Sequence, residues 1–312
     1  MKRVFLFFCC LLFFSFSLFA GSRREASRNE PLRVGIMLAV ESLPLMLARD
    51  RGYFEQEGVN VELVLFSNPQ ERDAALQAGR LDAAITDLLA ASFFVAGGLD
   101  FRVTSSTDGR FGFVASPQSG ITRLEELRGR RVGISLHSII QYALDTKLEA
   151  VGVSMTEYEA VAVPRVPLRV EMVLEGLIDA TGLPEPILTA AVAQGATLLS
   201  TTDEMGIDAT VLFFSLRALN TRLDEIRAFY RAYYRAAMSI NANPDAFRDF
   251  LVEAAGFPAS VRDAYQFVTY RRPTLPEIAQ IEQALNWLSA RGLLTADLKP
   301  EDLLDSRAIS GW

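Results

Sequence analysis

Residues 32–66 read LRVGIMLAVESLPLMLARDRGYFEQEGVNVELVLF, which is the pattern of a strand, a helix and a second strand. The apolar run Val34–Leu38 predicts the first strand, and the second is expected over Val61–Phe66. Between them, Leu43–Arg51 has the composition of a helix, and Gly52 can adopt the left-handed conformation that ends one. A strand that returns through a helix to another strand predicts a parallel pair.

The same alternation of strands and helices continues along the chain to Ser105 and starts again at Phe111. Further strands are expected at Leu81–Ile85, Phe101–Ser105, Phe111–Ala115, Arg131–Ser135, Tyr158–Val163, Ile178–Gly182, Thr197–Ser200 and Val211–Leu216, with helices between most of them. After Leu216 every apolar repeat is helical. We therefore predict an α/β protein of two lobes, each a mostly parallel sheet flanked by helices, with a helical C-terminal tail that returns to the first lobe.

The predicted boundaries make the first lobe discontinuous. It comprises residues 32–110 and 217–312, and the second lobe comprises residues 111–216. On this division Phe111–Ala115 and Val211–Leu216 are the two segments that cross between the lobes and form a hinge.

Residues 1–22 have the layout of a signal peptide. Lys2 and Arg3 precede an apolar run from Val4 to Ala20, and small residues follow it. This run also approaches the length that spans a bilayer, so a retained membrane anchor is the alternative to cleavage. Either way the expected location is periplasmic or extracytoplasmic.

The composition excludes several classes of function. The net charge is −7, with no basic stripe, so nucleic acid is not an expected partner. Cys9 and Cys10 both lie in the leader, and His137 is the sole histidine. The rest of the chain therefore offers no disulfide, no thiolate nucleophile and no cysteine-built zinc site. We expect no catalytic residue, no metal and no cofactor.

Several motifs in order resemble a known family. The segments are residues 43–61 (LPLMLARDRGYFEQEGVNV), 75–84 (ALQAGRLDAA), 127–134 (LRGRRVGI), 174–180 (LEGLIDA) and 184–186 (PEP). Together they resemble the periplasmic substrate-binding proteins of sulfonate, nitrate and thiamine-pyrimidine transporters, over roughly Leu32 to Met238. The resemblance implies a type II periplasmic binding protein that closes its lobes on a small molecule. It also implies a monomer that docks on an ABC permease driven by a cytoplasmic ATPase.

Ligands of open α/β sheets bind beyond the carboxyl ends of the strands. That rule, applied to the predicted strands, selects the candidate ligand-binding residues Glu41, Ser42, Asp87, Ser105, Thr107, Ser135, His137, Ser138, Glu185 and Phe214. Helix capping is an alternative role for Asp87 and Ser138, and His137 can equally be a polar loop residue. Glu185 is chosen partly because the family resemblance implies a Glu-Pro contact with a pyrimidine-type ligand.

The candidate crevice contains carboxylates and no arginine or lysine. Glu41, Asp87 and Glu185 are expected to repel an anion, so an amine-bearing ring such as a thiamine-precursor pyrimidine is favoured over a sulfonate or nitrate. Eukaryotic thiamine-pyrimidine synthases and porphobilinogen deaminase share the architecture, but both depend on cysteines that this chain lacks outside its leader. A transcription regulator of similar fold would need a DNA-binding segment where the leader stands.

Overall fold

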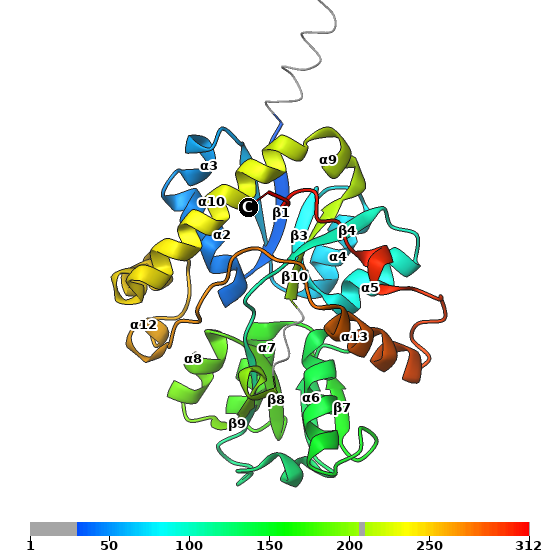
Figure 1. Cartoon of the computed structure of the whole chain (residues 1–312). Coiled ribbons are helices and arrows are strands. Elements are labelled where there is room, and N and C mark those ends of the chain that lie inside the picture. The colour runs from blue at the N-terminus through cyan, green and yellow to red at the C-terminus, as the bar shows by residue number, and fades with distance from the viewer. Residues whose placement is uncertain (1–29, 206–209, 312) are drawn as a thin grey trace, which may run out of the picture.

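The computed structural model describes residues 30–205 and 210–311, so the predicted signal peptide lies outside the described residues. The described residues form two five-stranded sheets with helices on their faces, one above the other in Figure 1. The upper sheet has the order β2 (Val61–Phe66), β1 (Leu32–Met37), β3 (Ala83–Asp87), β10 (Thr210–Ser215) and β4 (Phe101–Ser106). The lower sheet has the order β7 (Glu159–Ala162), β6 (Arg131–Ile134), β8 (Ala180–Pro184), β5 (Phe111–Ala115) and β9 (Thr197–Thr201). The predicted two-lobed α/β fold is confirmed.

One strand of each sheet runs against the other four. In the first lobe β10 is antiparallel to both β3 and β4, and in the second lobe β5 is antiparallel to both β8 and β9. Each is the strand by which the chain enters a sheet from the other lobe. Because it enters at the edge where the parallel strands end, it must run in the opposite direction.

The predicted crossing segments therefore need correction. Phe111–Ala115 lies within the second sheet as β5, and Val211–Leu216 belongs to β10 and the start of the next helix, in the first lobe rather than the second. The first connection is residues 107–110, between β4 and β5, and the second joins β9 to β10. Thr107 Oγ1 lies 2.9 Å from Thr210 Oγ1, and the Phe111 amide donates to Thr202 Oγ1 at 3.1 Å. The two crossing segments are thus bonded to each other at both ends.

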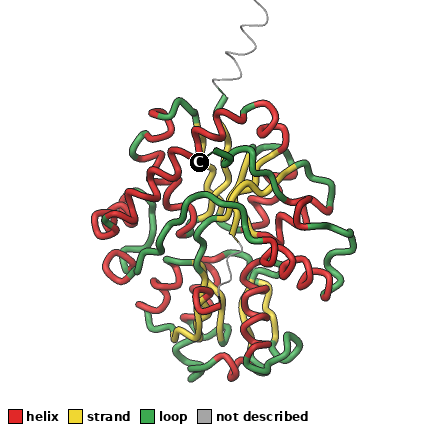
Figure 2. The backbone as a smooth tube through the Cα atoms, in the orientation of Figure 1, coloured by secondary structure: helices red, strands yellow, loops and turns green. Residues whose placement is uncertain are grey.

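The helices cover both faces of each sheet (Figures 1 and 2). Those of the first lobe are α2 (Leu43–Asp50), α3 (Tyr53–Gln56), α4 (Pro69–Gln77), α5 (Leu88–Ala96), α9 (Leu216–Thr221), α10 (Leu223–Ala242), α11 (Arg248–Glu253), α12 (Val261–Ala264) and α13 (Ile278–Ala290). Those of the second lobe are α6 (Ile139–Ala150), α7 (Val166–Leu174) and α8 (Ile187–Ala193). As predicted, Gly52 is left-handed (φ 64°) between α2 and α3.

The helical tail packs on the first lobe, as its pattern predicts. The apolar stripe Ile226, Tyr230, Tyr233 and Ala237 of α10 is buried in one core with α2 and β1. Phe54 stacks on Phe229 with ring centroids 5.6 Å apart. The tail also reaches the second lobe, where Trp287 of α13 meets Tyr142 of α6 edge-on at 5.8 Å.

An equivalent aspartate closes the same corner in both lobes. The Asp82 carboxylate accepts the Arg33 amide at 3.1 Å before β3, and the Asp179 carboxylate accepts the Arg131 amide at 2.8 Å before β8. The backbone amides of both aspartates return a bond of 2.9 Å, to the carbonyls of Arg33 and Arg131 respectively. These aspartates tie β1 to β3 in the first lobe and β6 to β8 in the second, which agrees with a turn role rather than a ligand role.

Within residues 30–205 and 210–311, no helix combines the length and the apolar character needed to cross a membrane.

Candidate functional site

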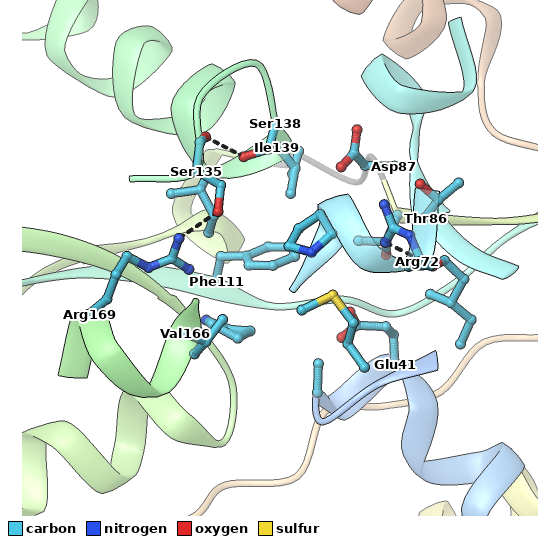
Figure 3. A pocket seen from close by; sticks show the side chains of 17 residues that line it. Glu41, Arg72, Thr86, Asp87, Phe111, Ser135, Ser138, Ile139, Val166 and Arg169 are labelled. Carbon is cyan, nitrogen blue, oxygen red and sulfur yellow. Dashed lines mark hydrogen bonds between the residues drawn. The ribbon is translucent and has the colours of Figure 1, made fainter. Parts of the chain in front are cut away.

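A cavity of about 60 Å³ lies between the two sheets (Figure 3). Its lining comprises Met37, Ala39, Glu41, Pro69, Arg72, Ile85, Thr86, Asp87, Phe111, Ser135, Ser138, Ile139, Ile140, Val166, Arg169, Pro184 and Thr210. One water needs roughly 10–15 Å³ by this measure, so the space suits a small ligand. The parallel strands β1, β3, β6 and β8 end at this cavity, and the two antiparallel strands β5 and β10 begin there, as the carboxyl-end rule predicts.

Glu41 provides a buried carboxylate on the first-lobe side. It lies in the one-turn 3-10 helix Val40–Ser42, directly after β1, and is 6% exposed. Tyr270 Oη donates to the Val40 carbonyl at 2.9 Å, and the Val40 amide donates across the lobes to the Glu185 carbonyl at 2.8 Å. Burial raises the pKa of Glu41 to about 7, against the opposing effects of its own backbone hydrogen bond and of Arg72. Its Oε2 has no hydrogen-bond partner, so it is available to a ligand donor.

Asp87, Thr86 and Arg72 surround the end of β3 on the same side. Asp87 Oδ1 accepts the Leu89 amide at 3.0 Å and the Ala90 amide at 2.9 Å, so it caps α5. Burial is the main cause that raises the pKa of Asp87. Thr86 Oγ1 is buried without a partner. Arg72 lies 2.8 Å from Asp73 and donates to the Ile85 carbonyl at 3.1 Å, so its charge is already paired.

The second-lobe side is formed by Ser135, Ser138 and Arg169. Arg169 on α7 is 1% exposed and donates to Ser135 Oγ at 2.6 Å and to the Val163 carbonyl at 3.2 Å. Ser138 precedes α6, but its hydroxyl donates back to the Ser135 carbonyl at 2.7 Å and caps no amide of the helix. Figure 3 shows Arg169 and Ser135 at one side of the cavity, with Asp87, Thr86 and Arg72 at the opposite side.

The structure brings four of the ten predicted site residues to the cavity: Glu41, Asp87, Ser135 and Ser138. Asp87 caps α5, which is one of the two roles considered for it, and it also lines the cavity. The capping role considered for Ser138 is not observed.

The other six predicted residues are absent from the cavity lining, and four of them have visible structural roles. Ser105 Oγ accepts a hydrogen bond from Tyr230 Oη at 3.0 Å, and Thr107 bonds to Thr210 between the lobes. Glu185 Oε2 accepts the amide and the hydroxyl of Thr189 on α8. Phe214 is fully buried against Phe229 and Tyr230. Ser42 is fully buried, and its hydroxyl has no partner. His137 is exposed, with its ring 6.5 Å from that of Phe93. Phe214 does not border the cleft, because β10 belongs to the first sheet and directs this ring into the core.

Sequence reasoning missed two arginines. The premise that the crevice contains no cation is wrong, because Arg72 and Arg169 both line the cavity. They reach it from helices rather than from strand ends, which is why the carboxyl-end rule passes over them. The sequence did contain a signal for Arg169. It shares the buried face of its helix with Val166 and Val173, and arginine is rarely buried unless it is paired.

Across the described segments, no group of three or more histidine, cysteine, aspartate or glutamate side chains is placed to hold a metal ion.

Residues 39–247 match the model of a protein family described as NMT1/THI5 like. Among curated proteins, the 4-amino-5-hydroxymethyl-2-methylpyrimidine phosphate synthase of Schizosaccharomyces pombe is 27% identical over 123 residues. That match covers 38% of this chain and 35% of the synthase, so it spans about a third of the length of that relative.

Solved structures share the fold over most of the chain. The alkanesulfonate-binding protein SsuA from Xanthomonas axonopodis pv. citri, bound to MOPS, has a TM-score of 0.76 at 19% identity and covers 88% of this chain and 98% of its own. The periplasmic nitrate-binding protein NrtA from Synechocystis PCC 6803 has a TM-score of 0.72 at 14% identity, with 89% and 84% coverage. The desulfurization enzyme DSZB has a TM-score of 0.62 at 16% identity, with 87% and 96% coverage. These likenesses show the periplasmic binding protein fold, and the family match over residues 39–247 shows that the chain belongs to the NMT1/THI5-like family.

Proposed function

We propose that this protein is the extracytoplasmic solute-binding component of an ABC importer and that it holds a small molecule between its lobes. The observation that carries the proposal is Glu41: a buried carboxylate oxygen without a partner faces a cavity between two sheets. An unsatisfied buried acceptor is costly, and a ligand donor that fills it is favoured by the same amount. Ligand contacts made to both lobes exist only when the lobes are together, so binding drives closure.

The importer role is supported by the relatives and by the leader. NrtA is named a periplasmic nitrate-binding protein and SsuA an alkanesulfonate-binding protein, so both neighbours are named for a small-molecule ligand. Residues 1–22 have the layout of an export signal. In this role the closed form docks, as a monomer, on a membrane permease whose energy comes from a cytoplasmic ATPase.

The ligand that we favour is an aminopyrimidine of the kind used to make thiamine. Glu41 and Asp87 are acceptors suited to an exocyclic amine, and Phe111 adds an aromatic surface to the lining. The name of the yeast relative refers to the same class of pyrimidine. Arg169 favours the alternative of a sulfonate or nitrate ligand, because it supplies a cation to the same cavity.

We propose capture without chemistry on the ligand. The yeast relative is a synthase and DSZB is an enzyme, so this family and this fold both extend to catalysis. Here, however, His137 is exposed and absent from the cavity lining. The polar groups around the cavity are carboxylates, hydroxyls and arginines, which suit recognition by hydrogen bonds.

Calorimetry with the mature protein tests the proposed ligand. We expect 4-amino-5-hydroxymethyl-2-methylpyrimidine to bind, and Glu41→Gln to weaken it by about 10- to 100-fold, because a hydrogen bond to a charged group is worth roughly 1.5–3 kcal/mol. The exposed Glu55→Gln is the matched control and should bind like the wild type. Taurine and nitrate are the competing probes. Tight binding of either one with no binding of the pyrimidine would favour the sulfonate or nitrate alternative, and turnover of the pyrimidine would contradict capture without chemistry.

A further inference from the structure

Arg169 is the least compensated charge at the cavity. It is 1% exposed, and its hydrogen bonds go to neutral oxygens, those of Ser135 and Val163. Its Nε is buried without a partner. Burial lowers its pKa only to about 10, so the guanidinium remains charged at neutral pH. A buried cation without an anion is costly, which makes this arginine a site prepared for a negative group.

We propose that Arg169 and Ser135 form an anion-binding pole of the cavity, so that the natural ligand is dipolar: a hydrogen-bond donor, such as an amine, meets Glu41, and a single acidic group meets Arg169. This assignment rests on the proposed function, because it takes the same cavity to be the ligand site. The acidic group can be a carboxylate, a phosphate or a sulfonate, since all three accept from a guanidinium fork.

The other positive features of the cavity are already engaged. Arg72 lies 2.8 Å from Asp73, which leaves Arg169 as the lining arginine without a carboxylate. The amino terminus of α6 faces Asp87 of the opposite lobe, whose pKa the Ile139 amide helps to lower against the larger effect of burial. An incoming anion is therefore directed to Arg169 and away from the side that holds Glu41 and Asp87.

The two poles belong to different lobes. Glu41 follows β1 in the first lobe, whereas Arg169 lies on α7 in the second. Between them the lining is largely apolar, with Phe111, Ile139 and Val166. A ring or short carbon chain with a polar group at each end matches this order, and both ends are held only while the lobes are together. A neutral pyrimidine satisfies one pole and leaves the other without a partner.

The test compares probes that differ only in the acidic group. The aminopyrimidine and its phosphate monoester are titrated into the wild type, Arg169→Met and the exposed Arg165→Met at fixed ionic strength. We expect the ester to bind the wild type at least tenfold more tightly than the neutral parent, Arg169→Met to abolish that advantage, and Arg165→Met to keep it. Equal affinity of ester and parent, or an unchanged advantage in Arg169→Met, overturns the anion pole. If the parent still binds and still depends on Glu41, the proposed function stands without it.

A second pair of probes makes the test independent of pyrimidines. Taurine carries an amine and a sulfonate, whereas ethanesulfonate carries the sulfonate alone. If neither pyrimidine binds, the favoured ligand is wrong, but stabilisation of the wild type by taurine that Arg169→Met removes still supports the anion pole. Absence of any response to all acid-bearing probes overturns it.

Folding of the variant is checked by its melting temperature and by its affinity for whichever probe the wild type binds without using its acidic group. Removal of an uncompensated buried charge should leave the melting temperature of Arg169→Met equal to or above that of the wild type. If the melting temperature of Arg169→Met falls and the variant binds none of the probes, Arg169→Lys provides the second variant. Lysine keeps the charge, so recovery of the ester advantage in Arg169→Lys supports the pole, and failure to recover it in a folded protein counts against it.

Discussion

As the pH rises from 4.5 to 8, ionisation of Glu41 is expected to lower the free energy of unfolding of the unliganded protein by about 3 kcal/mol. Glu41→Gln is expected to remove this part of the pH dependence. Burial raises the pKa of Glu41 from 4.5 to about 7, so in this interval the folded protein binds a proton that the unfolded chain has released. Stability from this group is therefore fully present below pH 4.5 and is lost as the pH rises through 7. Glutamine imitates the protonated acid and carries no titration.

Denaturant unfolding at several pH values, without ligand, measures this effect. The wild type should become less stable toward pH 8, partly through Asp87 and Glu185, whose pKa values burial also raises. The slope should be shallower in Glu41→Gln and unchanged in Glu55→Gln. Equal slopes in all three proteins would show that Glu41 ionises freely in the folded state.

Asp82→Ala is expected to lower the free energy of unfolding by about 3 kcal/mol, and Asp179→Ala by about 1 kcal/mol. Asp82 accepts the Arg33 amide of β1 and Asp179 accepts the Arg131 amide of β6, but their surroundings differ. Asp82 is 8% exposed, accepts Arg217 Nη2 at 2.7 Å, and lies 3.9 Å from the guanidinium of Arg222, whose side chain is 10% exposed. Asp179 has Arg130 at 3.9 Å, and both of those side chains are substantially exposed. Removal of Asp82 therefore leaves the partly buried Arg222 with Glu225 as its carboxylate partner and removes the ion pair of Arg217.

The pair is its own matched control, because the two aspartates make the same backbone bonds in two lobes. Denaturant unfolding should show the larger loss for Asp82→Ala. A larger loss for Asp179→Ala would mean that the backbone hydrogen bonds, rather than the ion pairs, determine how much each aspartate contributes to the free energy of unfolding.

Much of the fold could be predicted because its elements have strong local patterns. The alternation in residues 32–66 yields β1, α2 and β2, and Gly52 marks the end of a helix because its φ is positive there. The sheet that β10 joins could not be read in this way. Residues 211–214 are apolar on both faces, so the run indicates a buried strand without indicating its neighbours. Pairing is a long-range choice, and the misplacement of Phe214 at the cleft followed from it.

The candidate site was predictable only where the backbone alone positions a side chain. Glu41, Asp87, Ser135 and Ser138 follow strands that end at the cavity, so a topological rule finds them. Arg72 and Arg169 extend from within helices, and their approach to the cavity depends on how α4 and α7 pack. The polarity of the site, and with it the expected ligand, was the part that the sequence described least well.

The bonded crossing between the lobes has a mechanical consequence. Thr107 is bonded to Thr210 at one end and Phe111 to Thr202 at the other, so the two connections are fixed to each other at their ends rather than being independent tethers. Phe111 and Thr210 also belong to the wall of the cavity. Any change in the angle between the two halves must then change the shape of this cavity, so whatever fills the cavity also restrains that angle.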